Sequence, residues 1–448
     1  MTTTIAGSSL NETSRSDPGM IPEGFVYRDQ SKRYPWWVKS VDKITTEVDE
    51  SIMEKPGPTV ITWFMRQPFE EIGKIMGKGR INYTEKIKNS EPGSRLQDVA
   101  LHQAASSFWW AGGRLSGQQA NASIFQLTKM AREAMSVKPS DFEAEPWQGS
   151  PAEASKMVET AGIFLGASQI SYTHVNEKLL PQNIIFDDHA DEVTRTEDGG
   201  QIFPSRFRYV ITGAALVPVP AGMRTPSALG NAADRLGFEH AWLSMTRLIV
   251  FLTSIGYGAK PIPSMNPIPW AVASGLGEMG RMNRLISPLY GGALRLFSII
   301  TDLPLALDKP IDFGLQEFCR VCKKCAESCP AGALSMEKEP SWEWEGEQPW
   351  HASGKKVWWE DSKKCITQQM SQRCVNCMMA CPWTKQDKTA LHKLAHAVGA
   401  RLPRVGGMLR KMDDLFGYGL MSKDNPRMND WWDYDIPISG IDSNRSRR

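Results

Sequence analysis

The chain lacks a net charge of either sign, because its 448 residues carry 52 basic and 50 acidic side chains, a formal charge of +2. A nearly neutral chain has no overall field that attracts nucleic acid or polyanionic substrates, so we expect a small, weakly charged ligand and no nucleic-acid partner. It also lacks a membrane-spanning run: the most apolar stretch, residues 248–258, is about half of the length required. The first residues show no basic, apolar leader and no twin-arginine pair, so we expect any export signal to have been removed or never present.

Apolar and aromatic side chains are plentiful. Apolar residues make up 41% and charged residues 23% of the sequence, which is typical of a globular chain with several packed units. Sixteen tryptophans and sixteen phenylalanines fill core in the first place, and could also line an apolar pocket. The candidates for such a lining are Trp63, Trp109 and Trp110.

Changes in pattern along the chain predict four units. We expect a mostly helical N-terminal unit at residues 1–150, with helical spacing clearest over 98–135, and an α/β unit at 151–312 with a surface insertion at about 181–205. A cysteine-rich unit follows at 313–395, and a basic tail at 396–448. Within the α/β unit, periodicity predicts helices at 152–162 and 232–256 and strands at 163–171, 208–217 and 294–301.

All eight cysteines lie in two runs, and each run ends in a Cys-Pro pair. The spacings are typical of a bacterial ferredoxin that binds two 4Fe–4S clusters, in which one run supplies three thiolates to a cluster and its last cysteine turns toward the neighbouring cluster. We therefore expect two interleaved ligand sets. The first set is Cys319, Cys322, Cys325 and Cys381; the second is Cys365, Cys374, Cys377 and Cys329.

Two other uses of the cysteines are less favoured. A disulfide framework does not suit a chain with a large core and cysteines confined to one short region. Zinc could bind the pattern formed by Cys377, Cys381, His392 and His396, but that site leaves six cysteines unused. The His392 and His396 pair also reads as an ordinary helix face.

A glycine pattern precedes the cysteines. Gly275, Gly277 and Gly280 match the dinucleotide fingerprint, and Asp302 stands where a ribose-binding acid would be sought. The fingerprint requires a preceding strand, whereas residues 263–269 are rich in proline and lead into a predicted helix start. We therefore interpret the glycines as a close backbone approach to a different bulky ligand.

Five strings occur in a fixed order over roughly residues 152–385: SGLGEMGR (274–281), TDL (301–303), DKP (308–310), EFCRVCKKCAESCPAGALS (317–335) and CVNCMMACPW (374–383). With these strings the sequence resembles a known family, the corrinoid-dependent respiratory reductive dehalogenases. The resemblance implies a nitroreductase-like α/β core beside a two-cluster ferredoxin unit, an α+β fold, and a base-off corrinoid as cofactor. It also implies that Gly275, Gly277, Gly280 and Arg281 lie against the corrinoid.

The resemblance also implies a catalytic set. In the family the clusters pass electrons to cobalt, which attacks the organohalide, and halide leaves as a proton arrives. Arg295 occupies the position of the arginine that contacts the halide, while Phe238 stands where a tyrosine proton donor is expected and Asn266 is the substitute for an asparagine. Phenylalanine cannot donate a proton, so we expect water near Arg295 or another side chain to deliver it.

The apolar Phe238 favours small polyhalogenated substrates, and we expect chlorinated alkanes, as in the chloroform and trichloroethane reductases of the family. The resemblance further implies a low-potential electron donor, and a small integral membrane protein that anchors the chain at the outer face of the cytoplasmic membrane. Two alternatives stay open: an epoxyqueuosine reductase, for which a basic surface is expected, and an electron-transfer subunit without corrinoid. The sequence leaves the lower base of the corrinoid and the oligomeric state open.

Overall fold

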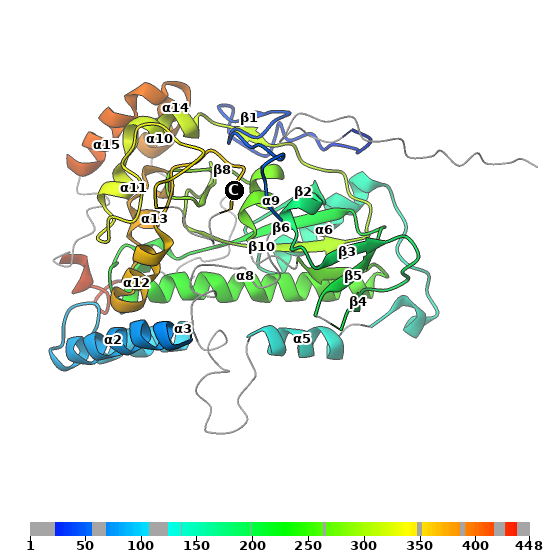
Figure 1. Ribbon diagram of the computed structural model, residues 1–448, viewed down its shortest axis with the longest axis horizontal. Coiled ribbons are helices and arrows are strands. Elements are labelled where there is room, and N and C mark those ends of the chain that lie inside the picture. Colours follow the sequence, from blue (N-terminus) through cyan, green and yellow to red (C-terminus); the bar gives the residue numbers. More distant parts are fainter. Residues whose placement is uncertain are drawn as a thin grey trace, which may run out of the picture.

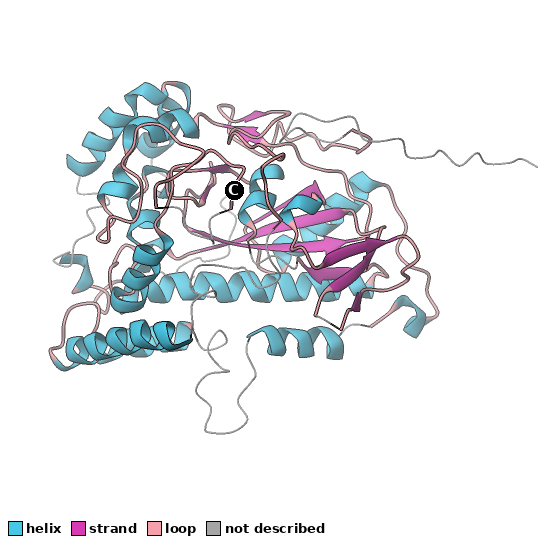
Figure 2. Cartoon of the chain, viewed as in Figure 1, coloured by secondary structure: helices cyan, strands magenta, loops and turns pink. Residues whose placement is uncertain are grey.

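The computed structural model describes nine stretches of the chain and places a mixed α/β core beside a cysteine-rich helical region (Figures 1 and 2). The predicted α+β fold class is confirmed. The unit boundaries stay a prediction. Trp63, Trp109 and Trp110 lie outside the described residues. These are 23–55, 69–106, 124–135, 137–197, 199–262, 266–346, 352–385, 390–415 and 426–436.

The core is built on a four-stranded antiparallel sheet in the order β2-β6-β10-β7. The two central strands are rich in β-branched and small residues and are buried along most of their length, as expected for strands covered on both faces. The strands are β2 (Gln169–His174), β6 (Tyr209–Leu216), β10 (Leu294–Thr301) and β7 (Ala259–Pro261).

The longest helix of the described residues, α8 (Ala228–Ser254), lies along one face of the sheet. The Ser227 hydroxyl caps its start by accepting from the Gly230 N–H at 3.1 Å. Gly237 brings the helix close to the strands, because a Cβ there would lie 2.8 Å from Val217 and 3.3 Å from Arg295. Helices α3 (Leu96–Ala105) and α5 (Ile124–Met135) cover the other side of α8.

Smaller elements complete the core. α6 (Pro151–Phe164) begins at a capping box between Ser150 and Glu153. The predicted insertion carries the three-stranded sheet of β3 (Ile184–Asp187), β5 (Gln201–Pro204) and β4 (Thr194–Arg195). The remaining short elements are β1 (Lys39–Ser40), β8 (Glu278–Met279), β9 (Leu285–Ile286), β11 (Ile311–Asp312), α7 (Val219–Gly222), α9 (Ile268–Ala273), η1 (Pro139–Phe142) and η2 (Glu177–Leu179).

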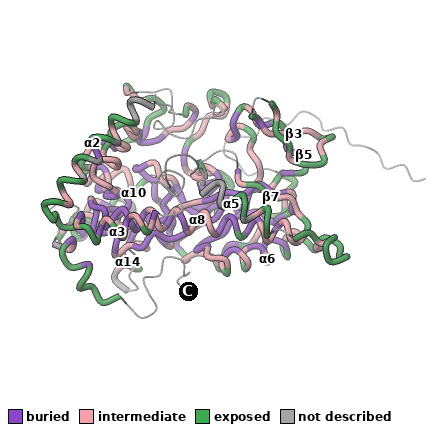
Figure 3. Tube along the Cα trace, turned by 90° about the horizontal axis from the view of Figure 1, so that it is seen from below, coloured by how far each residue is buried: buried purple, intermediate pink, exposed green. Residues whose placement is uncertain are grey.

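The cysteine-rich region consists of short helices and packs on the core. A buried cluster of apolar side chains joins it to α8 and to the N-terminal segment through Trp37, Phe313, Phe318 and Trp383. Figure 3 shows buried residues along α8. α2 packs on α12. The helix α2 is formed by Phe69–Lys88. The helices of the cysteine-rich region and of the residues after it are α10 (Leu315–Cys322), α11 (Lys324–Glu327), α12 (Ser362–Gln372), α13 (Asn376–Ala380), η3 (Pro382–Thr384), α14 (Ala390–Arg401), η4 (Pro403–Val405), α15 (Gly406–Leu415) and η5 (Pro426–Met428).

Most predicted elements are present, with shifted limits. The strand predicted at 163–171 is wrong in its first half, because α6 continues to Phe164 and β2 starts at Gln169. The helix predicted at 232–256 begins four residues earlier, at Ala228, where Ser227 caps it. Within the N-terminal unit that was predicted to be mostly helical, residues 23–55 form no helix and pack on the core: β1 pairs with β11, and Tyr27 pairs with Leu307. Across the described stretches, no helix is both long and apolar enough to cross a membrane.

Candidate functional site

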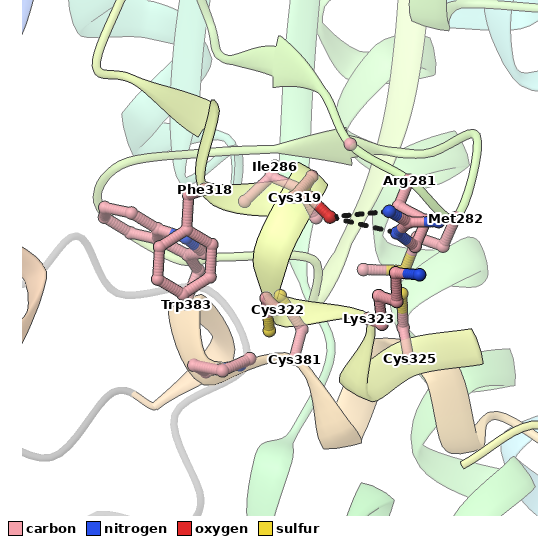
Figure 4. Close-up of a pocket in the computed structure, with 12 residues that line it drawn as sticks. Arg281, Met282, Ile286, Phe318, Cys319, Cys322, Lys323, Cys325, Cys381 and Trp383 are labelled. Carbon is pink, nitrogen blue, oxygen red and sulfur yellow. Dashed lines mark hydrogen bonds between the residues drawn. The ribbon is translucent and has the colours of Figure 1, made fainter. Parts of the chain in front are cut away.

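The structure gathers the first predicted set of four cysteines around one cavity (Figure 4). Cys319 and Cys322 come from α10, and Cys325 from α11. Lys323, between the two helices, has a left-handed backbone with φ of 53° that reverses the chain. Cys381 lies directly after the last residue of α13, and the short helix η3 begins at Pro382. Four thiols at one cavity are the donor set that a 4Fe–4S cluster requires. The apolar lining includes Met282, Ile286, Phe318 and Trp383.

The second predicted set lies next to the first. Cys374 and Cys329 act electrostatically on Cys377, and Cys377 acts on Cys365. Cys377 also acts on Cys325 of the first set, so the two sets are neighbours. All eight cysteines are free, which excludes the disulfide framework.

Burial controls the protonation of these thiols. It raises the pKa of Cys319 and of Cys377 to about 12 and that of Cys374 to about 11. A buried thiol keeps its proton unless a cation stabilises the thiolate. Iron ligation therefore has to displace these protons, and cluster assembly is coupled to proton release.

Two arginines in and next to the glycine-rich segment, Arg281 and Arg284, interact with the cysteine region. The Arg281 guanidinium donates to the Cys319 carbonyl oxygen at 2.8 and 3.1 Å and to the Ser335 carbonyl at 2.8 Å, and it stacks over the Trp358 ring at 4.6 Å. Arg281 thus holds the first cysteine loop, and its contact with a corrinoid stays a prediction.

Arg284 was missed by the sequence reasoning. Its guanidinium forms two bonds with the Glu360 carboxylate, at 2.9 and 3.3 Å, and it acts on Cys365 and Cys377. Its spacing of three residues from Arg281 is the signal that could have suggested a second, parallel contact. The segment therefore supplies one guanidinium to each cysteine set.

The glycines of the fingerprint lie close to other parts of the chain, and their contact with a corrinoid stays a prediction. A Cβ at Gly275 would lie 2.2 Å from the Lys309 carbonyl oxygen, and one at Gly277 would lie 2.2 Å from the Ile286 carbonyl oxygen. The close backbone approach is thus to the protein's own chain. A Cβ at Gly280 would lie 2.8 Å from the Cγ1 of Ile286. Asp302 accepts from the Gly258 N–H and pairs with Arg206, which leaves the dinucleotide interpretation without its acid.

Arg295 and Phe238 meet beside the sheet. Arg295, on β10, lies over the Phe238 ring of α8 with its guanidinium carbon 4.3 Å from the ring centroid. It forms an ion pair with Asp234, and its Nη2 is 3.4 Å from the Met378 Sδ on α13. The predicted pair is therefore brought together, next to the helix that carries Cys377.

The other predicted residues do not join this group. Asn266 is exposed, and its Oδ1 accepts from the Ile268 N–H at 3.4 Å at the start of α9. His396 stacks on Trp383 with ring centroids 4.9 Å apart, and its Nε2 lies 3.2 Å from the Pro382 carbonyl oxygen. That ring is thus engaged with a backbone oxygen and an indole, which disfavours the zinc alternative.

The fold and the cysteine sets define an iron–sulfur protein of the α+β class. Residues 318–384 match the family model of the 4Fe–4S double cluster binding domain, and residues 32–196 match that of the reductive dehalogenase subunit. In these stretches the chain is similar to the reductive dehalogenase family and to the double cluster domain.

Individual relatives agree with this assignment. The chain is 37% identical over 203 residues to a tetrachloroethene reductive dehalogenase of Desulfitobacterium hafniense, covering 43% of this chain and 36% of that protein. It is 29% identical over 286 residues to a tetrachloroethene reductive dehalogenase of Sulfurospirillum multivorans, covering 62% and 55%. The matched parts thus span between about a third and just over half of these relatives.

A solved reductive dehalogenase structure, titled as suggesting a mechanism for B12-dependent dehalogenation, shares the fold. Its TM-score is 0.63 at 19% identity, and the match covers 94% of this chain and 55% of that one. An epoxyqueuosine reductase of Cyclobacterium marinum is 37% identical over 65 residues, which is 14% of this chain. The resemblance to that enzyme is thus confined to a short segment.

Proposed function

We propose that this chain is a reductive dehalogenase that uses two 4Fe–4S clusters and a corrinoid to replace a carbon–halogen bond of a small organohalide with a carbon–hydrogen bond. The observation that carries the proposal is the contact of Arg295 with α13, because it joins the cysteine region to a cluster of Arg295, Asp234 and Phe238 beside the sheet. A bare electron-transfer subunit needs no such cluster.

The clusters and the corrinoid would have separate roles in the proposed reaction. The clusters deliver electrons one at a time, and the corrinoid supplies the metal centre that reacts with the organohalide. The cysteine cavity fits a cluster by its donor set. Because Gly275, Gly277 and Gly280 face the chain itself, corrinoid contact at this segment rests on the resemblance. The solved relative whose title names B12 supports the corrinoid.

Arg295 supplies a fixed positive charge beside the sheet, and Phe238 supplies an apolar surface that excludes water. Arg295 is fixed by Asp234 and by the Phe238 ring, so its guanidinium is oriented before a halide departs. Phe238 makes that wall apolar and gives no proton, so water held near Arg295 is the proposed proton source. Asn266, exposed at the start of α9, is not favoured as a catalytic residue.

The proposed substrate is a small chlorinated hydrocarbon, with chlorinated alkanes first. The relatives are named for tetrachloroethene, trichloroethene and chloroethene, which supports small chlorinated molecules as a class. The apolar Phe238 wall favours a saturated, polyhalogenated carbon without a hydroxyl group.

We propose that the chain acts peripherally at the outer face of the cytoplasmic membrane, with a low-potential electron donor and a small integral anchor protein. Helices α14 and α15 and the turn between them expose apolar and basic side chains, while Asp413 is buried against Lys324 and Lys385. A surface of this kind suits an interface with anionic lipid, although the whole chain is nearly neutral. The exposed residues are Lys393, Leu394, Arg401, Leu402, Arg404, Met408, Lys411, Met412 and Leu415.

Metal analysis and halide release test the function. The protein purified without oxygen should contain iron and cobalt, and methyl-viologen-reduced protein should release halide from a panel of chloroalkanes, chloroalkenes and chlorophenols. Iron without cobalt would identify an electron-transfer subunit. Cobalt without halide release, with reduction of epoxyqueuosine in RNA, would identify the epoxyqueuosine reductase alternative.

A further inference from the structure

Two arginines lie beside the Phe238 ring and share the carboxylate of Asp234. Arg235 lies on α8 one turn before Phe238, with its guanidinium carbon 5.9 Å from the ring centroid. Arg295 lies over the same ring at 4.3 Å. Asp234 is the carboxylate that acts on Arg235, and its Oδ1 already accepts from Arg295.

The positive charges of these arginines act on neighbouring ionisable groups. Arg373 and Arg295 oppose the protonated form of Arg235, in addition to its burial. Arg235 and Arg373 act in the same direction on His102, which contacts Asn231 one turn further back on α8 at 3.0 Å. The positive field thus extends over a turn of the helix.

Both arginines retain an unused donor. The Nε–H groups of Arg235 and Arg295 are buried and have no hydrogen-bond partner among the described residues. A buried donor without a partner is costly. An anion that accepts from these N–H groups would relieve this cost.

We infer that Arg235 and Arg295 together form a halide subsite, with the Phe238 ring as its apolar wall. The inference rests on the proposed function, because dehalogenation converts the organohalide, two electrons and a proton into the dehalogenated product and a free halide. Guanidinium groups are weakly hydrated and pair well with such an anion, and the apolar wall removes competing water. Arg235 is then a second halide-binding residue, beyond the single arginine that the sequence indicates.

Halide binding by the resting protein tests the subsite without turnover. Sodium bromide is titrated into the full-length protein at constant ionic strength, with sodium gluconate as the balancing salt, and bromide NMR line width is measured. We expect saturable binding that weakens at least about tenfold in Arg235→Gln, since a charge-assisted hydrogen bond contributes about 1.5–3 kcal/mol. Unchanged affinity in that variant, or no saturable binding by the wild type, would overturn the inference.

Two further variants sharpen the test. Arg247→Gln removes an exposed arginine of the same helix and should keep wild-type affinity. Arg235→Lys keeps the positive charge but loses the planar set of N–H donors of the guanidinium group. This variant should therefore bind bromide more weakly than wild type and more tightly than Arg235→Gln. If Arg235→Gln does not fold, wild-type affinity in Arg235→Lys contradicts the subsite.

Cobalt content and turnover separate the remaining possibilities. An Arg235→Gln protein that loses cobalt but keeps its bromide affinity would show that Arg235 serves the corrinoid, and the inference would fall. Bromide binding that depends on Arg235, in a protein that releases no halide from any organohalide, would leave the subsite standing and reject the proposed function.

Discussion

Single charged residues decide the electrostatics around the cysteines. Arg284 and Glu360 form a pair beside Cys365 and Cys377, so a cation and an anion act on the same ligand set. A cation near a cluster favours its reduced, more negative form, and a nearby anion disfavours it. The balance between the two side chains thus sets part of the reduction potential.

Replacing Arg284 should lower the potential of one cluster. We expect Arg284→Gln to shift the midpoint of the cluster held by Cys365, Cys374, Cys377 and Cys329 downward by on the order of 50 mV, close to a tenfold change in its reduction equilibrium. Glu360→Gln should shift it upward. Electron paramagnetic resonance redox titration measures both, and equal shifts of both clusters would contradict the local effect.

A buried histidine makes stability depend on pH. Burial, followed by the charges of Arg373 and Arg235, lowers the pKa of His102 to about 3. The unfolded chain binds this proton below about 6.5, whereas the folded chain does not, so the contribution is full above pH 6.5 and is lost as pH falls toward 3.

His102→Gln should remove this dependence. Between pH 7 and pH 5 the wild type should lose about 2 kcal/mol more unfolding free energy than the variant, because the variant cannot titrate. Urea unfolding at the two pH values measures the difference. Parallel pH dependences of the two proteins would mean that His102 is not the titrating group.

At the scale of the helices, the two cysteine runs exchange their last members. Cys329 follows α11, but its electrostatic neighbours are Cys374 and Cys377, and Cys381 follows α13 but joins the cavity of Cys319. The turn at Lys323 and the break at Pro382 direct the chain in this way.

Serine substitutions test the exchange. We expect Cys381→Ser and Cys319→Ser to impair the same cluster and Cys329→Ser to impair the other, each lowering the iron content by up to about half. Spectra of the reduced variants identify which cluster is lost. If Cys329→Ser and Cys319→Ser removed the same signals, the ligand sets would follow the sequence runs instead.

For the whole molecule, the N-terminal segment is tied to the sheet by a buried carboxylate. The Asp308 side chain has no exposed surface; it accepts from the Tyr172 N–H at 3.0 Å and pairs with Arg28 and Arg33 at 3.3 Å. Burial raises the pKa of Asp308 against the effect of both arginines. The pairing therefore depends on two cations that come from a segment remote in sequence.

Asp308→Asn should loosen this attachment. Removing the Asp308 charge leaves the partly exposed Glu159 as the remaining counter-ion of Arg28 and Arg33, at a cost of up to about 3–5 kcal/mol. Limited proteolysis should then cut residues 23–55 faster, and thermal unfolding should begin earlier. Asp42→Asn, which breaks the exposed pair with Lys309, should change stability by less than about 1 kcal/mol. Equal sensitivity of the two variants would contradict a special role for Asp308.

The sequence by itself determined the features that depend on local pattern. The spacing of the cysteines predicted their grouping into two sets, and apolar periodicity predicted α8, β6 and β10, because both signals repeat over a few residues. Limits that depend on capping and packing were missed, as at the start of α8 and the end of α6.

Only the tertiary structure decided which distant groups meet. It placed Arg281 on the cysteine loop, set Gly275 against Lys309, and brought Arg235 and Arg295 to one aromatic ring. These contacts join segments that are tens of residues apart, and their charge and burial arise only when the segments pack. A sequence pattern has no measure of that environment, and the halide subsite could not have been found without it.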